Sequence, residues 1–422
     1  MTKISFRSLG LFLCWTTLAN AQSLLTPEEA VRIALQNNYS LSLARDQSAE
    51  ATVNRQSGIG PFLPGASASV NTSGSLIDTV THVTAVGASL NWQIFEGFQS
   101  YHAYRRLKST EKAAELQERL TLETTVESVL NGYYTVVLQK QLLIAIRELT
   151  GVAEDQAKLA QAKAEVGSGS HLDQLQAIAT FNQDSSSLLS QEIALRQSKI
   201  QLNQLLARDP AEEFETVDTI PVQENLPVSN RKSALSENNT SILQASAQRD
   251  AIASGLSQAK GVWWPSLSAG VGYSTTPSAL NSGNTPAKSG TTYNVNLSVP
   301  LFDKLAAHQQ VGDAKLELKH DETRLKLTEQ NVRAEFELDG QKYSSGLRQV
   351  DLEERNLEVA RLQADAAAER YKDGAGTALE FRDAQRILLD AKSRLVNARQ
   401  NTQQAELALK RLAGVIVIPL FR

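Results

Sequence analysis

Alternating apolar and polar residues mark four segments that are expected to form β-strands. In residues 83–94 one face is apolar and the other is polar or small, with Val86, Ala88, Leu90, Trp92 and Ile94 opposite Gly87, Ser89, Asn91 and Gln93. Residues 66–76, 267–275 and 292–301 alternate in the same way. Strands of about ten residues suit a tilted membrane strand. The alternation alone fits a soluble sandwich equally well.

Long helical stretches flank these strands. Thr26-Pro27-Glu28-Glu29 supplies an N-cap, a proline at the first helical position and a capping-box glutamate. Helices are expected over residues 26–56, 98–166, 171–207, 232–259, 304–372 and 377–412.

The chain contains one structural unit twice. Asn37-Asn38 recurs as Asn238-Asn239 at an offset of 201 residues, and Ile94-Phe95-Glu96 recurs as Leu301-Phe302-Asp303 at an offset of 207. The spacing from Phe95 to Gly167 equals that from Phe302 to Gly374, 72 residues in each copy. Such a conserved spacing indicates an internal duplication. The expected division is residues 22–207 and 232–412 as the two repeats, 208–231 as a connecting or equatorial segment, and 413–422 as a C-terminal equatorial tail.

The helix lengths predict how each unit folds. The long helix, about 100 Å at ~1.5 Å per residue, needs partners along its whole length. The two shorter helices of the same unit, stacked end to end, match it. A heptad seam with small residues runs along the last helix through Ala384, Leu388, Ala391, Leu395, Ala398, Thr402, Ala405, Leu409 and Leu412. By itself this seam also suits an ordinary coiled-coil stalk.

The strands favour a membrane over a stalk. Four strands are too few to close a barrel, and an open sheet edge is not tolerated in lipid, so a membrane barrel would have to be built from several chains. Six aromatic residues gather where strands meet helices, as in an interfacial girdle: Phe62, Trp92, Phe95, Trp263, Trp264 and Phe302. The polar strand faces would then line a water-filled passage.

Composition and charge exclude several functions. Residues 1–21 combine Lys3 and Arg7, an apolar stretch and Ala19-Asn20-Ala21, which is typical of a secretory signal peptide. Met1 and Cys14, the chain's one methionine and one cysteine, fall inside it. A mature chain without cysteine excludes disulfides, cysteine-based metal sites and thiol nucleophiles. Removing Lys3 and Arg7 leaves 40 basic against 46 acidic residues, which argues against nucleic-acid binding.

No catalytic, cofactor or metal motif stands out. The Gly-rich runs lie between helices rather than after a strand, so a phosphate cradle is not expected. The histidines lack metal-ligand spacing, and we expect no metal, no cofactor and no enzyme activity. Gly132, Gly340 and Gly346 interrupt the long helices and could mark either bends or contacts with the connecting segment, residues 208–231.

Taken together, the Thr-Pro-Glu-Glu-Ala opening, the Ala34-Leu35-x-x-Asn38 start, the strand pairs and the duplicated glycine turns resemble the TolC-type outer-membrane efflux proteins over nearly the whole mature chain. The resemblance implies a mainly helical fold with a membrane β-barrel portion. Four strands from each protomer of a homotrimer would form the barrel in outer-membrane lipid, above a periplasmic α-barrel. It also implies a periplasmic adaptor and an inner-membrane pump of the RND, ABC or MFS type as partners. The exported cargo, whether drug, metal ion or protein, would be set by that pump.

The resemblance also assigns roles at the tips of the helical hairpins. Glu380 and Asp383 occupy the positions of the periplasmic constriction, and Tyr371 and Asp173 match two positions of the tip lock. The adaptor would dock at the turns, around Gly167, Gly169, Ser170, Gly374, Gly376 and Thr377. Gly376 stands where the family lock has an arginine, so the lock is expected to be weaker or built differently. The alternative from another class of function is a secreted, soluble coiled-coil scaffold or adhesin.

Overall fold

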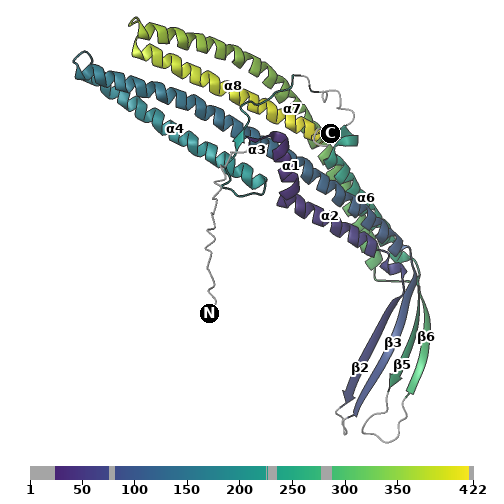
Figure 1. Ribbon diagram of the computed structural model, residues 1–422. Helices are drawn as coiled ribbons and strands as arrows, with labels where there is room; N and C mark the ends of the chain where they lie inside the picture. The colour runs from purple at the N-terminus through teal and green to yellow at the C-terminus, as the bar shows by residue number, and fades with distance from the viewer. Residues whose placement is uncertain (1–23, 76–80, 225, 227–234, 277–287, 418–422) are drawn as a thin grey trace, which may run out of the picture.

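The computed structural model describes residues 24–75, 81–224, 226, 235–276 and 288–417. The predicted signal peptide, residues 1–21, lies outside the described residues, as do parts of the predicted connecting segment and tail. The two halves repeat the same order of elements, a short helix pair, two strands, a long helix and a helix (Figure 1).

The first half contains β1 (Leu24–Leu25), α1 (Pro27–Asn37), α2 (Tyr39–Ser57), β2 (Gly65–Ser75), β3 (Thr81–Glu96), α3 (Gln99–Glu165) and α4 (His171–Leu205). After β4 (Glu215–Thr216), the second half contains α5 (Leu235–Asn238), α6 (Thr240–Lys260), β5 (Ser266–Thr276), β6 (Lys288–Ser298), α7 (Ala306–Lys372) and α8 (Ala378–Leu412). Single 3₁₀ turns, Gly60–Phe62 and Gly261–Trp263, precede β2 and β5. The long helices α3 and α7 have the same length, 67 residues, and α4 and α8 both have 35.

The helices form a wall that is one helix thick. Near the sheet the packing order is α2, α3, α6, α7, and beyond the joint it is α4, α3, α8, α7. Each long helix therefore spans two shorter ones stacked end to end, as the lengths predict (Figure 1). Within the described ranges, no helix combines the length and the apolar character needed to cross a bilayer.

The joint between the stacked helices is where the structure differs from the expected helices. The helix predicted over 26–56 is broken at Asn38, whose ψ of 123° is extended. The helix predicted over 232–259 is broken in the same way at Asn239, with ψ 119°. Both asparagines cap the helix that follows, and an asparagine side chain competes for backbone hydrogen bonds in this manner.

Two apolar clusters thicken the wall at the level of the joint. One contains Val126, Tyr133, Leu202 and Phe214, and the other contains Ile242, Phe336 and Leu412. The β1–β4 pair lies beside the first cluster, where the Tyr133 hydroxyl donates to Leu25 O (2.7 Å) and accepts from Val217 N (3.1 Å). The main core is therefore a central belt rather than a globular centre.

Of the three glycines considered above, Gly132 and Gly346 allow close helix packing. A Cβ on Gly346 would overlap the Thr402 side chain on α8, and one on Gly132 would lie 3.1 Å from Leu205 Cδ1 on α4. A Cβ on Gly340 would meet nothing within 4 Å. Gly132 and Gly346 thus mark helix–helix contacts, whereas Gly340 lies open.

Candidate functional site

The four-stranded antiparallel sheet continues the helical wall at one end and has the order β2-β3-β5-β6 (Figure 1). Its register aligns apolar residues across all four strands, as in the row Ala66, Leu90, Val271 and Tyr293. The neighbouring row aligns Ser67, Ser89, Gly272 and Thr292. The sheet thus has one apolar and one polar face, as the alternation predicts.

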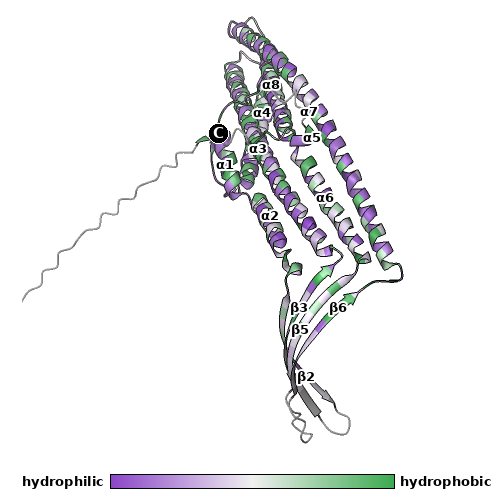
Figure 2. Cartoon of the chain, turned by 90° about the vertical axis from the view of Figure 1, so that its right-hand side faces the viewer, coloured by the Kyte–Doolittle hydropathy of each residue, from purple (hydrophilic) through white to green (hydrophobic). Residues whose placement is uncertain are grey.

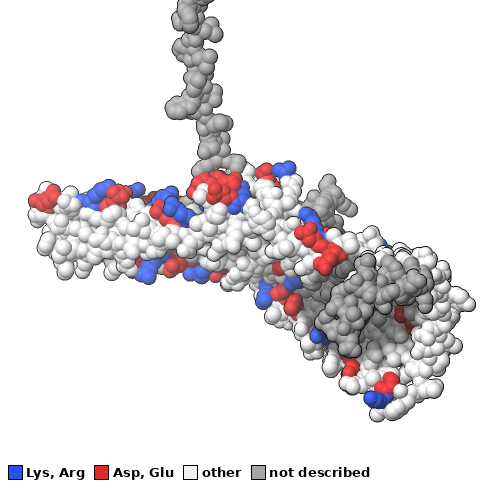
Figure 3. All heavy atoms as spheres, turned by 90° about the horizontal axis from the view of Figure 1, so that it is seen from below, with Lys and Arg blue, Asp and Glu red and all other residues white. Residues whose placement is uncertain are grey.

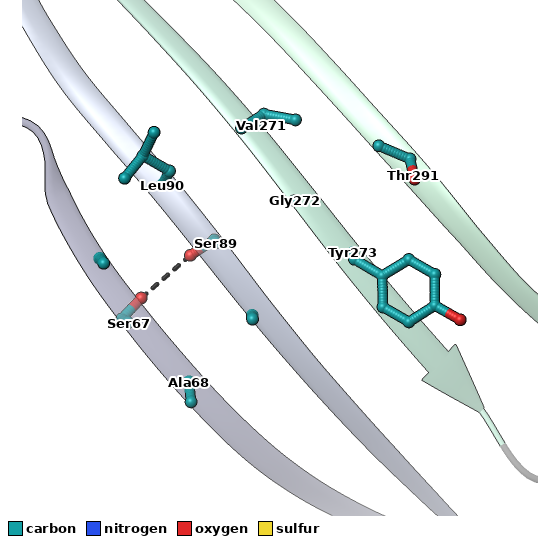
Figure 4. A pocket seen from close by; sticks show the side chains of 10 residues that line it. Ser67, Ala68, Ser89, Leu90, Val271, Gly272, Tyr273 and Thr291 are labelled. Atoms are coloured by element: carbon teal, nitrogen blue, oxygen red, sulfur yellow. Dashed lines mark hydrogen bonds between the residues drawn. The ribbon is translucent and has the colours of Figure 1, made fainter.

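Figure 4 shows part of this sheet from close by. The Ser67 and Ser89 hydroxyls hydrogen bond across β2 and β3 at 2.9 Å, while Leu90, Val271 and Tyr273 lie along the adjacent positions. The apolar residues are solvent-exposed, with 44% of Val271, 53% of Tyr273 and 86% of Tyr293 accessible. Within the described residues nothing covers this apolar face, and an exposed apolar surface of this kind marks a site of contact with a partner protein or a membrane.

One detail of the apolar face differs from the sequence expectation. A β-bulge lies between Gln93 and Phe95, so Phe95 rather than Ile94 pairs with Leu267. Strand β6 also ends at Ser298, before the predicted end at 301. Pro300, two residues further on, has no N–H to donate to a sheet.

The predicted girdle residues lie where strands join helices. Trp92 Nε1 donates to Phe62 O at 3.0 Å, and both rings are more than 40% exposed. Trp263, Trp264 and Phe302 are exposed as well. Phe98 is not among the predicted girdle residues, yet its ring lies 5.2 Å from Phe95 and 6.3 Å from Trp264 and so links two strand–helix junctions.

At two of these junctions, two consecutive residues have a positive φ. Gly97 (φ 65°) and Phe98 (φ 63°) are both left-handed, and so are Lys304 (φ 57°) and Leu305 (φ 69°) at the equivalent positions of the second half. A Cβ on Gly97 would collide with Gly261 O. The β3–α3 turn therefore packs tightly against the α6–β5 turn, a contact that sequence spacing did not reveal.

At the opposite end, both hairpin turns have the same backbone. Gly167 (φ 72°) and Gly374 (φ 71°) each adopt the left-handed conformation after a long helix. The N–H groups of Ser168 and Gly169 donate to Lys163 O, and those of Ala375 and Gly376 donate to Arg370 O, all at 2.9 Å. A Cβ on Gly169 would approach Lys163 to 2.9 Å, which explains the second glycine.

The following helices begin with different caps. Ser170 Oγ accepts from Leu172 N at 3.1 Å, and the predicted Asp173 is exposed in the same first turn. Thr377 and Glu380 form a full capping box, with Glu380 N to Thr377 Oγ1 at 3.2 Å and Thr377 N to Glu380 Oε2 at 3.3 Å.

Glu380 and Asp383 both lie on the exposed start of α8. Arg370 Nη2 is 4.0 Å from the Glu380 carboxylate. The Tyr371 ring stacks on Phe381 of its own hairpin, with centroids 5.3 Å apart and planes at 4°. Within the part of the chain that the structure describes, no hydrogen bond joins Tyr371 to Asp173.

Ion pairs connect the two hairpins. Arg411 on α8 lies 2.6 Å from Glu127 on α3, Lys392 pairs with Glu148, and Arg382 lies 4.0 Å from Asp184 on α4. Burial raises the pKa of Asp184, while the positive charges of Arg382 and Arg386 oppose that shift. The contact nearest the tip therefore joins a partly desolvated carboxylate to a cationic face of α8.

Among the described residues, no group of three or more His, Asp or Glu side chains is arranged to hold a metal ion.

The fold is similar to that of solved outer-membrane channels. CmeC of Campylobacter jejuni superimposes with a TM-score of 0.84 at 16% identity, covering 98% of this chain and 94% of that chain. VceC of Vibrio cholerae gives 0.78 at 16% identity, covering 92% and 96%. The open state of MtrE of Neisseria gonorrhoeae gives 0.77 at 15% identity, covering 92% and 89%. No curated protein sequence matches the chain.

The family assignment comes from the sequence itself. The model of the outer membrane efflux protein family matches residues 30–208 and again residues 232–415, one match in each half. This family consists of outer-membrane efflux channels rather than enzymes. With its duplicated helices, its four-stranded sheet and these two matches, the chain belongs to the outer membrane efflux protein family.

Proposed function

We propose that this chain is the outer-membrane exit duct of a tripartite efflux or type I secretion system. Three copies would form a tube that crosses the outer membrane and extends into the periplasm. A periplasmic adaptor would dock on the hairpin tips and connect the tube to an inner-membrane pump, whose cargo would leave through it.

The observation that carries this proposal is the open sheet with one exposed apolar face. β2 and β6 are its edges, and within the described residues each pairs with a single neighbouring strand. Unpaired strand edges cannot remain in lipid, because their backbone groups would have no hydrogen-bond partner. Pairing β6 of one copy with β2 of the next removes the edges, and three copies close a barrel of twelve strands.

The edge helices support the same assembly. α4 and α7 lie at opposite edges of the helical wall beyond the joint. Beyond the joint both carry exposed apolar side chains: Leu175, Leu189 and Ile193 on α4, and Leu352, Val359 and Leu362 on α7. Packing α4 of one copy against α7 of the next would bury both sets.

The distribution of charge fits a membrane location for the sheet. The four strands hold two charged residues, Glu96 and Lys288, and each is the terminal residue of its strand. Charged side chains instead follow the helical part (Figure 3), where hydrophilic and hydrophobic positions alternate along each helix (Figure 2). Trp92, Trp263 and Trp264 at the strand–helix junction suit the interface between lipid and water.

At the other end we propose that Glu380 and Asp383 form the periplasmic constriction. Three copies of each carboxylate around a narrow axis would repel one another and attract cations. The tip lock assigned by resemblance to Tyr371 and Asp173, and adaptor docking at the two glycine turns, belong to the same proposal.

Two experiments test the proposal. Chemical crosslinking of membrane fractions should give a trimer that is extracted only by detergent, whereas a soluble monomer would contradict the assembly. In planar bilayers, the double variant E380A/D383A should show a larger conductance and weaker cation selectivity. The variant D46A/E50A, which removes two exposed acids from α2, is the matched control and should leave both quantities unchanged. Unchanged conductance and selectivity in E380A/D383A would exclude these residues as the constriction.

A further inference from the structure

The two hairpin tips have the same backbone but different side-chain bracing. The left-handed glycines and the paired N–H donors to the last helical turn are common to both. Because the two tips differ by a constant 207 residues, each position of one has a direct counterpart in the other. The first tip is therefore an internal control for the second.

Aromatic stacking is present in the second tip alone. Tyr371, in the last turn of α7, and Phe381, in the first turn of α8, lie face to face at 5.3 Å and are both half-buried. Their counterparts in the first tip are Ala164 and Gln174, which cannot stack. Parallel aromatic rings add attraction beyond the area that they bury, so this pair ties the end of one helix to the start of the next.

The same tie orients the Glu380 side chain. Glu380 precedes Phe381, and its carboxylate is held by the Thr377 N–H and lies 4.0 Å from Arg370 Nη2. Arg370 also donates to Ala375 O at 3.3 Å, so the guanidinium spans the turn. In the first tip the corresponding acid is Asp173, whose shorter side chain follows a serine cap without a capping box.

We propose that Tyr371, Phe381 and Arg370 form a clasp that makes the second tip a stiff unit and positions the Glu380 carboxylate, leaving the first tip as the compliant one. On this proposal Tyr371 also braces its own hairpin through Phe381, in addition to the tip-lock role proposed above. The mechanical part of the proposal is independent of the proposed function, whereas the effect on ion passage rests on it.

Limited trypsin digestion of the detergent-purified full-length protein tests the mechanical part. Lys372 and Lys163 are exposed, each next to one of the two turns, and provide a cleavage site at each tip. F381A should raise the cleavage rate at Lys372 by about fivefold, the effect of losing one aromatic pair, because proteolysis follows local opening. Cleavage at Lys163 should not change. F381Y, which keeps the ring, should restore the slow rate, and Q174A at the equivalent position should alter neither site.

A transplant provides the converse test. A164Y/Q174F places the two rings at the equivalent positions of the first tip and should slow cleavage at Lys163 severalfold. An unchanged rate at Lys372 in F381A, or an equal increase at both tips, would overturn the clasp.

Bilayer recordings separate the two proposals. With the clasp and the channel both correct, F381A should shift cation selectivity in the same direction as E380A, and F381Y should restore it. Altered proteolysis together with no conducting activity of the parent protein would contradict the channel and leave the clasp standing. Altered proteolysis with unchanged selectivity in a conducting F381A protein would remove the positioning role of Phe381.

Discussion

Asn38 and Asn239 occupy equivalent joints in the two halves of the chain and each bonds the end of the other stacked helix. Asn38 Oδ1 accepts from Leu41 N at 3.2 Å while its Nδ2 donates to Leu205 O at 2.9 Å. Asn239 Oδ1 accepts from Ser241 N and Ile242 N, and its Nδ2 donates to Leu412 O, again at 2.9 Å. Each asparagine therefore caps one stacked helix and binds the final turn of the other, which joins the two stacked helices to each other.

This relationship predicts a large loss of stability on truncation of Asn239. N239A removes a cap and leaves the buried Leu412 carbonyl without its donor, which should lower the free energy of unfolding by about 2–3 kcal/mol. N38A, at a less buried joint, should cost about 1–2 kcal/mol. Chemical denaturation of the purified protein measures both. The adjacent exposed residues supply matched controls, N37A and N238A, and a loss as large in these would contradict the assignment.

Gly346 and Gly340 should respond in opposite ways to alanine. A Cβ at position 346 would overlap Thr402, so G346A should destabilise the protein by about 1–3 kcal/mol in spite of its better helix propensity. At position 340 there is open space, and G340A should stabilise by roughly 0.5–1 kcal/mol. Thermal unfolding of both variants provides the comparison. If the second change Thr402→Ala restores the stability lost in G346A, the overlap with Thr402 is the cause of that loss.

Lys304 occupies a backbone conformation that costs energy for any residue with a Cβ. Its φ of 57° matches that of its counterpart Gly97, so the second half retains the turn without the glycine. K304G should stabilise the protein by about 1 kcal/mol, since a left-handed residue with a side chain costs roughly that much. The neighbouring exposed residue Asp303 accepts a backbone hydrogen bond and is unsuitable as a control, so K315G inside α7 serves instead and should destabilise.

Tyr134 should make the stability of the protein depend on pH in the alkaline range. Burial, assisted by the negative charge of Glu28, raises its pKa to about 12. In the unfolded chain a tyrosine ionises near 10. The contribution of Tyr134 to stability should therefore be complete below pH ~10 and be lost as the pH rises toward 12, because the unfolded state releases its proton first. Y134F should flatten this alkaline decline, and ultraviolet titration of tyrosinate should show one fewer late-ionising group. A decline as steep as in the parent would show that other groups are responsible.

Much of the fold follows from local sequence signals. The constant offset of 207 residues between Phe95 and Phe302 and between Gly167 and Gly374 predicts two equal long helices, because helix length is proportional to residue count. Strict alternation around Leu90 and Leu297 predicts strands with one apolar face, since successive strand residues point to opposite sides. The glycine turns are also predictable, because their left-handed backbone selects that residue.

Only part of the candidate site could be predicted from the sequence. Glu380 and Tyr371 could be named from their positions, but the stacking partner Phe381 lies ten residues away across a turn, and nothing in the spacing distinguishes it from other half-buried residues. Phe98 was missed for the same reason, because its contact with Trp264 joins the two halves of the chain.

The sequence by itself determined the duplication, the types and lengths of the long elements and the two-faced strands, because these depend on periodicity and on residue counts along the chain. Tertiary structure alone decided the breaks at Asn38 and Asn239, the bulge beside Phe95 and the pairing of Tyr371 with Phe381. The physical reason is that each of these rests on contacts between groups that periodicity does not relate: a side-chain amide and a distant carbonyl, two strands of different repeats, or two rings across a turn.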